Sequence, residues 1–596
     1  MEVNFLSLIV EKAVERGNGE ALGYKKTGSE EWFSYSWKEL AEKVNKTSSA
    51  LLANGLRRQE NVGIFAQNMP EWTIVDLGII NINAVSVPIY ATNTSNQAAY
   101  IIDEAEIRFL FVGDDDQYQK ALEIYSHTGC TLEKIIVFDR NTKINHSNAL
   151  YFEDFINSDI NISADELEGI SKGITNDDLA TIIYTSGTTG EPKGVMLTHG
   201  NFNKSFEIHD IRLDTYKDDH SLAFLPLSHI FERAWSLYAL YKGIKVSYLK
   251  DPKLIIETLG VVKPTMMCSV PRLYQKAYHT INAKVGASSN IKKKLFKYAL
   301  KTGKKKAEFI RKNKNIPFLF GLKHKIVDSI VLKKIRSAFG GKLKLIPCGG
   351  APLSGEMTEF FHALGMPVLI GYGLTETCAT VSVFPDKGYQ YGTVGIPMPD
   401  VEVKIGPEDE IWVKGDIIMK GYYKKPEETD KVFEDGWFKT GDAGKMEADG
   451  TITITDRIKD LMKTSGGKYV APQPLESLLI NDNFIENAIL IGDDKPYVTA
   501  LLVPNFEALK EYAHSLNISY HSLEELIKKS GIIEFYEGKL DQLQHKLANF
   551  EKVKKFTLLP SDFNMTLGEL TPTLKIRRKI ILQHFTPLIE EMYAIA

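Results

Sequence analysis

The sequence is poor in cysteine and has no long apolar run. Its 596 residues include four cysteines, which form no CxxC and no paired spacing: Cys130, Cys268, Cys348 and Cys378. This scatter argues against a disulfide framework or a zinc site and indicates a reducing compartment. No apolar run approaches the length of a membrane span. The first apolar stretch follows an early acid and is too short for a secretory signal. We therefore expect a cytoplasmic protein, or one attached peripherally to a membrane.

The sequence also lacks a strong net charge and an internal repeat. A formal net charge of −4 gives no general reason to expect a nucleic-acid partner. An apolar share of 43% with 25% charged residues is ordinary for a globular enzyme. No repeat of fixed period is evident. The length predicts about four domain-sized units, or fewer large ones.

Residues 184–194, YTSGTTGEPKG, are the most informative segment. Residues 181–184 and 195–197 are typical of buried strands. The loop between them offers backbone N–H groups, the hydroxyls of Ser186, Thr188 and Thr189, and the cation of Lys193. These groups suit a polyphosphate, whereas the alternative, a plain hairpin turn, does not need so many donors beside a lysine. The spacing matches neither a Walker A loop nor a dinucleotide fingerprint.

This segment resembles the signature of the adenylate-forming superfamily, which includes acyl-CoA synthetases, luciferases and peptide-synthetase adenylation domains. Further segments follow in that family's order and span nearly the whole chain: 347–352 (PCGGAP), 371–377 (GYGLTET), 439–444 (KTGDAG), 456–461 (DRIKDL) and 572–577 (PTLKIR). The resemblance is to AMP-forming acyl-CoA ligases, and its long-chain branch shares the leucine that precedes Lys575. Many relatives carry glycine there.

Helical and strand patterns alternate along residues 35–110, with a helix expected over 37–52 and a strand over 61–66. This alternation predicts an α/β fold with crossover units and a mostly parallel sheet. Residues 400–456 predict a small antiparallel subdomain, and the patterns after residue 457 predict a small α+β domain.

The resemblance implies where the domains divide. It gives a large N-terminal domain of layered sheets and helices over 1–456, a hinge over 457–460, and a mobile C-terminal domain over 461–596. The N-terminal domain is expected to hold the nucleotide and acyl sites, and the C-terminal domain is expected to contribute one catalytic lysine.

The resemblance also implies a nucleotide site. The loop would hold the departing phosphates of ATP through Thr185, Ser186, Gly187, Thr188, Thr189, Gly190 and Lys193. Gly350, Ala351 and Pro352 would line the adenine pocket, and Tyr372, followed by Gly373, would stack on the base. Thr375 would donate to the α-phosphate, and Glu376 would hold Mg²⁺. A helix start is the alternative for these two residues.

Other functional residues are implied around the hinge. Asp442, in an exposed loop flanked by glycines, would accept from the ribose hydroxyls, with Arg457 as a second ribose contact; an Asx turn is the alternative. Lys459 matches the hinge position. Gly466 and Gly467 resemble the loop that meets the CoA arm, and Lys468 would touch the phosphate. Lys575 would reach the α-phosphate and the acyl carboxylate, although alone it resembles a solvated charge.

The walls of the acyl site are expected in 225–235 and 269–274. These segments contain His229, Trp235 and Val270. His229 is interpreted either as a gate to the acyl site or as a core histidine whose hydrogen bonds are satisfied.

Residues 291–336 differ in composition from the rest of the chain. They contain sixteen Lys or Arg and two acids, interrupted by apolar residues. One interpretation is a solvated helical insertion, spanning about 285–340. The other is a basic amphipathic surface that contacts anionic lipid. The long-chain branch of the family resembles this chain in having an insertion here.

The leading hypothesis is an AMP-forming long-chain fatty acid–CoA ligase that uses ATP, Mg²⁺, a fatty acid and CoA. A second hypothesis is adenylation followed by transfer to a carrier-protein thiol, which the absence of an attached carrier domain disfavours. A third is a non-catalytic module that binds acyl-adenylate. The presence of every expected polar group disfavours this third hypothesis.

Overall fold

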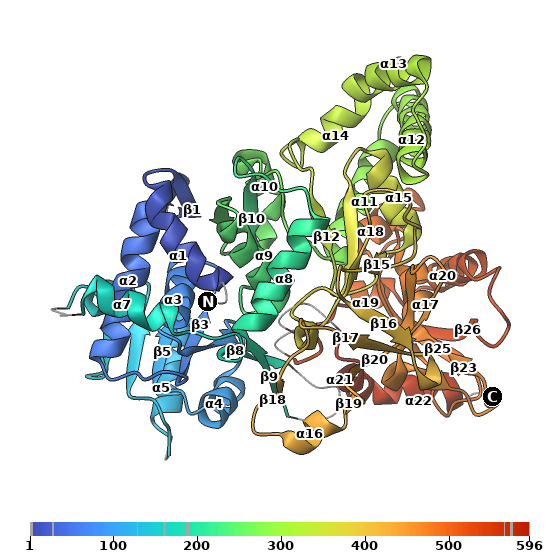
Figure 1. Ribbon diagram of the computed structural model, residues 1–596. Coiled ribbons are helices and arrows are strands. Elements are labelled where there is room, and N and C mark those ends of the chain that lie inside the picture. The colour runs from blue at the N-terminus through green and yellow to red at the C-terminus, as the bar shows by residue number, and fades with distance from the viewer. Residues whose placement is uncertain are drawn as a thin grey trace.

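The computed structural model describes residues 4–26, 29–127, 129–158, 162–185, 191–564, 567–571 and 576–594. An eight-stranded sheet lies at the centre of the N-terminal part (Figure 1). Strands β8, β4, β3, β5, β6 and β7 pair in parallel, and β9 and β18 extend the sheet in antiparallel pairing. The predicted mostly parallel sheet is confirmed. In spatial order the strands are β18 (Gly421–Tyr422), β9 (Lys193–Thr198), β8 (Leu179–Thr185), β4 (Val85–Tyr90), β3 (Asn61–Ala66), β5 (Phe109–Val112), β6 (Lys134–Val137) and β7 (Ala149–Tyr151).

Capping residues, glycine and proline define the ends of the helices beside this sheet. In α2 (Trp37–Ala53), Ser36 and Glu39 form a reciprocal capping box, and Gly55 follows the end with φ 82°. Helix α3 (Pro70–Asn81) starts with proline and is buried along almost its whole length. The other helices of this part are α1 (Phe5–Arg16), α4 (Ser95–Glu104), α5 (Asp115–Tyr125), α6 (Phe152–Ile156) and α7 (Ala164–Lys172).

Two further sheets and four more helices belong to the N-terminal part. One sheet has the order β10-β11-β1-β2 and the other β12-β13-β14-β15. Their strands are β10 (His220–Ala223), β11 (Lys245–Tyr248), β1 (Glu20–Lys25), β2 (Trp32–Ser36), β12 (Ile346–Cys348), β13 (Val368–Tyr372), β14 (Ser382–Val383) and β15 (Ile396–Pro397). The helices are α8 (His199–Arg212), α9 (Ile230–Tyr241), α10 (Ile255–Val262) and α15 (Gly355–Ala363).

The predicted antiparallel subdomain is present. Every strand pairing in it is antiparallel. Its strands are β16 (Glu402–Ile405), β17 (Glu410–Lys414), β19 (Phe433–Glu434), β20 (Trp437–Met446) and β21 (Ile452–Arg457), and α16 (Pro426–Asp430) lies between β18 and β19 in the chain.

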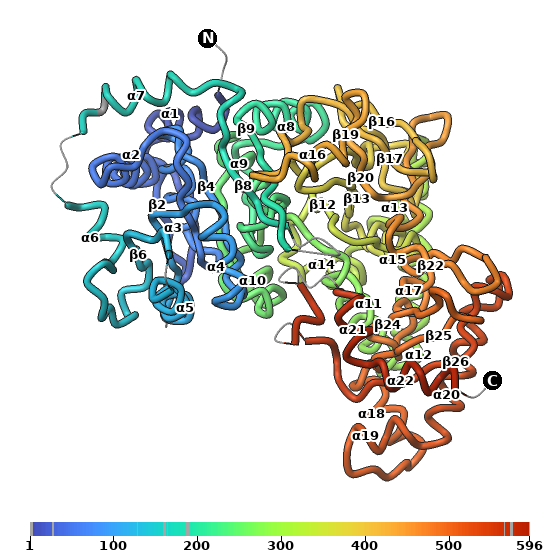
Figure 2. The backbone as a smooth tube through the Cα atoms, turned by 90° about the horizontal axis from the view of Figure 1, so that it is seen from below, coloured from blue at the N-terminus to red at the C-terminus, as the bar shows by residue number. Residues whose placement is uncertain are grey.

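The C-terminal part has its own sheet and its own apolar clusters, as the predicted small α+β domain requires. Strands β24 (Ile485–Ile491) and β25 (Val498–Pro504) are antiparallel, and β26 (Val553–Leu558) joins β25 in parallel. A separate hairpin joins β22 (Met462–Lys463) to β23 (Tyr469–Val470). The helices are α17 (Pro472–Ile480), α18 (Phe506–Ser515), α19 (Leu523–Leu526), α20 (Ser530–Leu543), α21 (Arg578–His584) and α22 (Thr586–Ala594). Figure 2 shows this part at one end of the molecule.

The basic insertion forms a helical arm. Helix α11 (Pro271–Gly286) leads into α12 (Asn290–Arg311), which is followed by α13 (Phe318–Val327), a π-helical turn η2 (Asp328–Leu332) and α14 (Lys333–Ser337). Gly303 allows α12 to pack against α15, because a Cβ there would lie 2.0 Å from the Ala363 carbonyl oxygen. In Figure 1, α12 and α13 rise above the rest of the molecule. Within the described ranges, no helix combines the length and the apolarity needed to cross a bilayer.

Candidate functional site

The expected phosphate loop connects β8 to β9. Thr185 and Lys193 are paired across this hairpin, while Ser186, Gly187, Thr188, Thr189 and Gly190 lie outside the described residues. Lys193 forms an ion pair with Glu428 of α16, and its ammonium lies 4.9 Å from the centre of the Tyr422 ring. Hydrogen bonds from Lys193 and Lys431 lower the pKa of Glu428 to about 2. The hairpin therefore places Lys193 in the cleft, where its counter-ion is the partly exposed carboxylate of Glu428.

Thr185 and Lys193 line a cleft with a volume of ≈ 3820 Å³. The segment after β13 lines the same cleft. Gly373 must be glycine, because a Cβ there would lie 1.6 Å from the Ala379 carbonyl oxygen. Thr375 and Glu376 begin a single 3₁₀ turn, η3 (Thr375–Thr377), and both line the cleft. Both features of the two interpretations are thus present, a short helical start and a place in the cleft, and the nucleotide roles stay predictions.

The residues that follow β12 complete the adenine side of the expected site. Gly350, Ala351 and Pro352 line the cleft together with Tyr372. Tyr372 is 8% exposed, and its hydroxyl donates to Asp442 Oδ2 at 2.7 Å. The structure thus brings the PCGGAP, GYGLTET and KTGDAG segments, far apart in the chain, to one wall.

Asp442 does not lie in an exposed loop, as the sequence suggested. It is 6% exposed and lies within β20, paired across the sheet with Arg457 of β21. The Arg457 Nε lies 3.4 Å from Asp442 Oδ1. The glycines on either side made the segment resemble a turn, but a bulge between Ala443 and Gly444 accommodates them within the strand pair. The expected proximity of Asp442 and Arg457 is present.

Glu376 is the candidate metal ligand. Its Oε1 accepts from the Tyr422 hydroxyl at 3.0 Å, and burial raises the pKa of the Glu376 carboxyl. In the described part of the chain, no group of three or more His, Cys, Asp or Glu side chains could hold a metal ion. One carboxylate fits Mg²⁺, since this ion keeps several waters and binds phosphate oxygens. The donor set suits a metal that arrives with a nucleotide.

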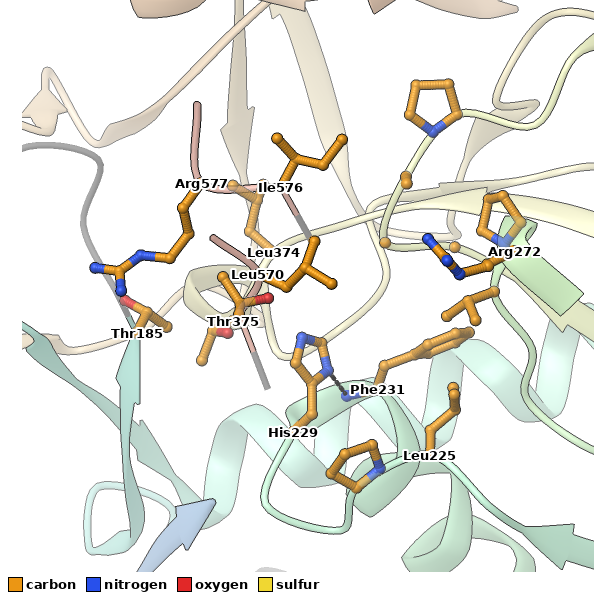
Figure 3. A pocket seen from close by; sticks show the side chains of 18 of the residues that line it. Thr185, Leu225, His229, Phe231, Arg272, Leu374, Thr375, Leu570, Ile576 and Arg577 are labelled. Atoms are coloured by element: carbon orange, nitrogen blue, oxygen red, sulfur yellow. Dashed lines mark hydrogen bonds between the residues drawn. The ribbon is translucent and has the colours of Figure 1, made fainter. Parts of the chain in front are cut away.

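An apolar wall continues from the nucleotide side of the cleft. In Figure 3 the His229 ring points toward Leu374, and the Phe231 amide donates to His229 Nδ1 at 3.2 Å. His229 is also the N-cap of α9. The indole of Trp235 donates to Ser221 Oγ at 3.0 Å. Trp235 and Val270 line the cleft, and their place in the acyl site stays a prediction.

Helix α9 also contains two buried charged residues that the sequence analysis missed. Arg233 and Asp76 of α3 are both fully buried and joined by two hydrogen bonds of 2.6 and 2.9 Å. Glu232 is fully buried as well, and its Oε2 accepts from the Leu225 amide at 3.1 Å. Burial raises the pKa of Glu232 to about 8. Adjacent charges inside the apolar run 230–240 were the signal that could have identified them.

Several segments of the C-terminal part line the cleft, among them the described residues nearest to Lys575. Leu570, Thr571, Ile576 and Arg577 line the cleft, and Figure 3 shows Arg577 near Thr185. Lys575 lies outside the described residues, although its neighbours flank the site. Lys459 lines the cleft within η5 (Ile458–Asp460).

The loop expected to meet CoA lies elsewhere. Gly466, Gly467 and Lys468 belong to the β22–β23 hairpin and are absent from the described cleft lining. Lys468 instead lies 5.9 Å from the centre of the Phe550 ring. Their assigned roles therefore stay predictions.

Several contacts link the C-terminal part to the rest, and two of them involve buried or paired carboxylates. Asp456 of β21 accepts from the Gln473 amide of α17 at 3.0 Å and from the Arg457 amide at 2.7 Å. Burial raises the pKa of this carboxyl to about 6. Arg272 of α11 donates to Asp562 at 2.7 Å. The first contact lies at the junction of the two parts and the second lies across the cleft.

Comparisons with known proteins identify the family of this chain. The family of AMP-binding enzymes matches residues 10–423, and the C-terminal domain of AMP-binding enzymes matches residues 459–596. The long-chain-fatty-acid–CoA ligase FadD15 of Mycobacterium bovis is 32% identical over 587 residues, covering 97% of this chain and 95% of that protein. The peroxisomal long chain acyl-CoA synthetase 7 of Arabidopsis thaliana is 31% identical over 595 residues, covering 95% and 82%.

Solved structures share the fold. The anthranilate CoA ligase AuaEII in complex with anthranoyl-AMP gives a TM-score of 0.75 at 18% identity, covering 99% of this chain and 98% of that one. The O-succinylbenzoate coenzyme A synthetase of Bacillus subtilis with ATP and magnesium gives 0.67 at 19% identity, covering 96% and 98%. The chain belongs to the family of AMP-binding enzymes, the adenylate-forming superfamily. Its general activity is that of an adenylate-forming acid–thiol ligase.

Replacing Asp442 with alanine should weaken nucleotide binding at least tenfold, measured by calorimetry with ATP and with AMP. The change removes a buried carboxylate, and a charge-assisted hydrogen bond contributes about 1.5–3 kcal/mol. Asp449→Ala is the matched control, since Asp449 is an exposed residue in the turn between the same two strands. Equal affinities for wild type and Asp442→Ala would show that Asp442 only organises the strand pair.

Replacing Glu232 with glutamine should change how stability depends on pH. The folded carboxyl keeps its proton up to about pH 8, whereas the unfolded one loses it near 4.5. Its stabilising contribution is therefore complete below about pH 4.5 and is lost as the pH rises to about 8. The melting temperature of Glu232→Gln, relative to wild type, should rise across this window. Glu207→Gln, on the exposed side of α8, should show no such trend, and a constant offset for Glu232→Gln would contradict the assignment.

Proposed function

We propose that this chain is an AMP-forming long-chain fatty acid–CoA ligase. In the first step, a carboxylate oxygen of the acid attacks the α-phosphorus of ATP, and the bond to pyrophosphate breaks. In the second, the CoA thiol attacks the acyl carbon of the adenylate, the bond to AMP breaks, and the thiol proton is released. The observation that carries the long-chain assignment is an apolar stripe along α11.

This stripe consists of residues spaced four apart on one helix face, all of which line the cleft: Leu273, Ala277, Ile281 and Val285. At 1.5 Å per residue the stripe runs about 18 Å. An extended chain covers roughly 1.2 Å per bond, since a residue of three backbone bonds spans at most about 3.5 Å. The stripe therefore matches about fifteen bonds of an acyl chain. Ile335 and Phe339 contribute further apolar lining.

The nucleotide end of the cleft supports the first step. The hairpin with Lys193 would hold the departing phosphates, and release of Lys193 from Glu428 would free its charge for them. Thr375 would donate to the α-phosphate, and Asp442 with Arg457 would bind the ribose. Tyr372 would pack against the base. Magnesium, held partly by Glu376, would neutralise phosphate charge when bound with ATP.

The C-terminal part supports a two-conformation cycle. Thr571 and Ile576, the nearest described residues on either side of Lys575, line the cleft, while Gly466, Gly467 and Lys468 in the turn of the β22–β23 hairpin do not. This arrangement suits the first step. We propose a rotation of residues 461–596 about the hinge 457–460, at Lys459, to bring the hairpin to the cleft for the second step. The N-terminal domain, 1–456, would stay unchanged.

Replacing Lys575 with alanine should reduce adenylation, measured as acid-dependent pyrophosphate release, by at least a hundredfold. Thioester formation from a supplied acyl-adenylate and CoA should change little, because the lysine would have left the site in that conformation. Lys554→Ala, an exposed lysine on β26, is the control. Equal losses in both half-reactions would contradict the two-conformation cycle.

Replacing Ala277 with phenylalanine should shorten the acids that the enzyme accepts. Ala277 is buried in the middle of the stripe, so a ring there would obstruct the channel beyond it. Turnover to acyl-CoA and AMP, measured across a series of acid lengths, should show kcat/KM falling at least tenfold for long acids and little for short ones.

The same assay tests the function itself. Ala283→Phe, on the exposed side of the same helix, should leave the length profile unchanged. Wild type should form acyl-CoA from long acids with CoA as acceptor. A preference for short or aryl acids would overturn the long-chain assignment, and turnover only with a carrier-protein thiol would overturn the CoA assignment.

A further inference from the structure

The most exposed apolar side chains of the described residues lie on the helical arm. Phe318 is 83% exposed and Leu319 is 79% exposed. Along α13 and η2 they are followed at helical spacing by Leu322, Ile326 and Ile330, which are 52%, 56% and 49% exposed. These five residues form what we call the α13 ridge. Contiguous exposed apolar surface of this kind marks an interaction site.

The ridge is free because α13 uses its other face to pack on α12. The Phe320 ring lies 5.6 Å from the Phe309 ring, and the Lys323 ammonium lies 5.0 Å from the centre of the Tyr298 ring. Val327 and His324 are buried on this inner side. The arrangement leaves the ridge exposed on the face of α13 that does not contact α12.

The surroundings of the ridge are strongly basic. Sixteen basic and two acidic residues give segment 291–336 a charge of +14, so the rest of the chain, with a total of −4, carries −18. Both acids are already paired within the arm, Glu308 with Lys312 and Asp328 with Arg336. Lys325 on α13 and Lys333 on α14 are exposed beside the ridge, whereas the Lys323 ammonium lies against Tyr298 of α12. Apolar side chains flanked by lysines match the chemistry of an anionic bilayer surface, whose acyl region and headgroups complement the two parts.

The structure also shows which lysines cannot take this role. Residues 304–306 form one of the two runs of three lysines in the arm. However, Lys304 forms an ion pair of 2.6 Å with Glu359 of α15, and Lys305 lies over the Phe320 ring. These side chains hold the arm to the body and to itself. The exposed lysines near the ridge are those of α13, α14 and the loop 312–317.

The base of the arm adjoins the far end of the acyl channel. Lys334, Ile335 and Phe339, in and after α14, line the cleft, and Ile335 and Phe339 belong to the same apolar cluster as Val285 of α11. Helix α10 lies beside α14 in both Figure 1 and Figure 2, and its Ile256 lines the cleft while 43% exposed. The channel therefore ends beside the element that continues into the ridge.

We propose that the α13 ridge and its flanking lysines dock this protein on an anionic lipid bilayer, with the end of the acyl channel near the same surface. Docking stands on the exposed ridge and the charge of the arm. Loading of the acid from the bilayer rests, in addition, on the proposed ligase function.

Binding is tested with vesicles of phosphatidylcholine alone or mixed with phosphatidylglycerol, in a flotation assay without substrates. The full chain should float with the anionic vesicles at low salt, and binding should fall as salt is raised, because charges are screened over about 8–10 Å. Leu319→Ser/Leu322→Ser should lower the partition coefficient at least tenfold. Lys325→Glu/Lys333→Glu should lower it to a similar extent.

Two matched variants serve as controls. Leu516→Ser/Ile533→Ser removes apolar residues of the C-terminal part, where Leu516 is 52% exposed, as Leu322 is. Lys38→Glu/Lys510→Glu reverses two exposed lysines outside the arm. Both should bind vesicles as wild type does. All four double variants should turn over a short, soluble acid at the wild-type rate without vesicles, since none of these residues lines the cleft.

Three results would overturn the docking proposal: wild type that ignores anionic vesicles at low salt, ridge variants that bind as well as wild type, or controls that lose binding equally. A dimer of the wild type, lost in Leu319→Ser/Leu322→Ser and unaffected by vesicles, would overturn it too and make the ridge a self-interface. If vesicle binding holds but no acid is ligated, the proposed function fails and docking remains. If docking holds and acid embedded in vesicles is used no faster by wild type than by the ridge variant, loading from the bilayer fails.

Discussion

The buried ion pair between Arg233 and Asp76 joins α9 to α3 in the interior of the N-terminal part. Arg233 belongs to α9, which follows the acyl-side loop, and Asp76 belongs to α3, which packs on the central sheet. The same guanidinium donates to Thr181 Oγ1 of β8 at 2.6 Å, and Thr181 donates to the Ser86 carbonyl of β4. One cation therefore joins the acyl helix to the strand that leads into the phosphate loop.

Such a pair is costly to bury and costly to break. Removing one partner of a buried ion pair typically costs about 3–5 kcal/mol, because the other charge is left uncompensated. Both carboxylate oxygens and three guanidinium nitrogens have partners here, so the desolvated charges are satisfied. The relative position of the acyl wall and the phosphate hairpin is consequently fixed within the N-terminal domain. The rotation that we propose accordingly leaves this pair intact and moves the C-terminal side.

The contacts on that side are weaker and fit a moving part. Arg272 and Asp562 are each about one-third exposed, so their ion pair is screened by solvent and contributes little. Within the C-terminal part, by contrast, Glu476 and Arg578 form a buried pair that ties α17 to α21. Of these two ion pairs, the one inside the C-terminal part is less exposed than the one across the cleft, and the buried Asp456 contact lies next to the proposed hinge. This division favours rotation of the C-terminal part as a unit.

The fold followed from the sequence where apolar periodicity was clear. The strand predicted at 61–66 and the helix predicted at 37–52 lie where expected, because each is bounded by a capping box or turn residues that act locally. Asp442 was misplaced since its neighbouring glycines are equally typical of a turn and of a strand bulge. Glu232 and Arg233 were missed because their partners come from segments distant in the chain. Pairing between distant segments leaves no local pattern.

The orientation of the helices in the arm also could not be predicted from the sequence. Its basic composition was evident, but a helix of alternating lysines and apolar residues can turn either face inward. Packing decides the matter: Gly303 admits the α15 backbone, Lys304 pairs with Glu359, and the Gly388 amide donates to the Arg311 carbonyl at 2.7 Å. These contacts fix α12 at its middle and its end, and α13 must then cover α12 with Phe320 and Val327. Leu319, Leu322 and Ile326 are left outward as a consequence. The ridge is therefore held by packing in one orientation, and a rigid apolar edge can enter a membrane surface without first paying the entropy of ordering itself.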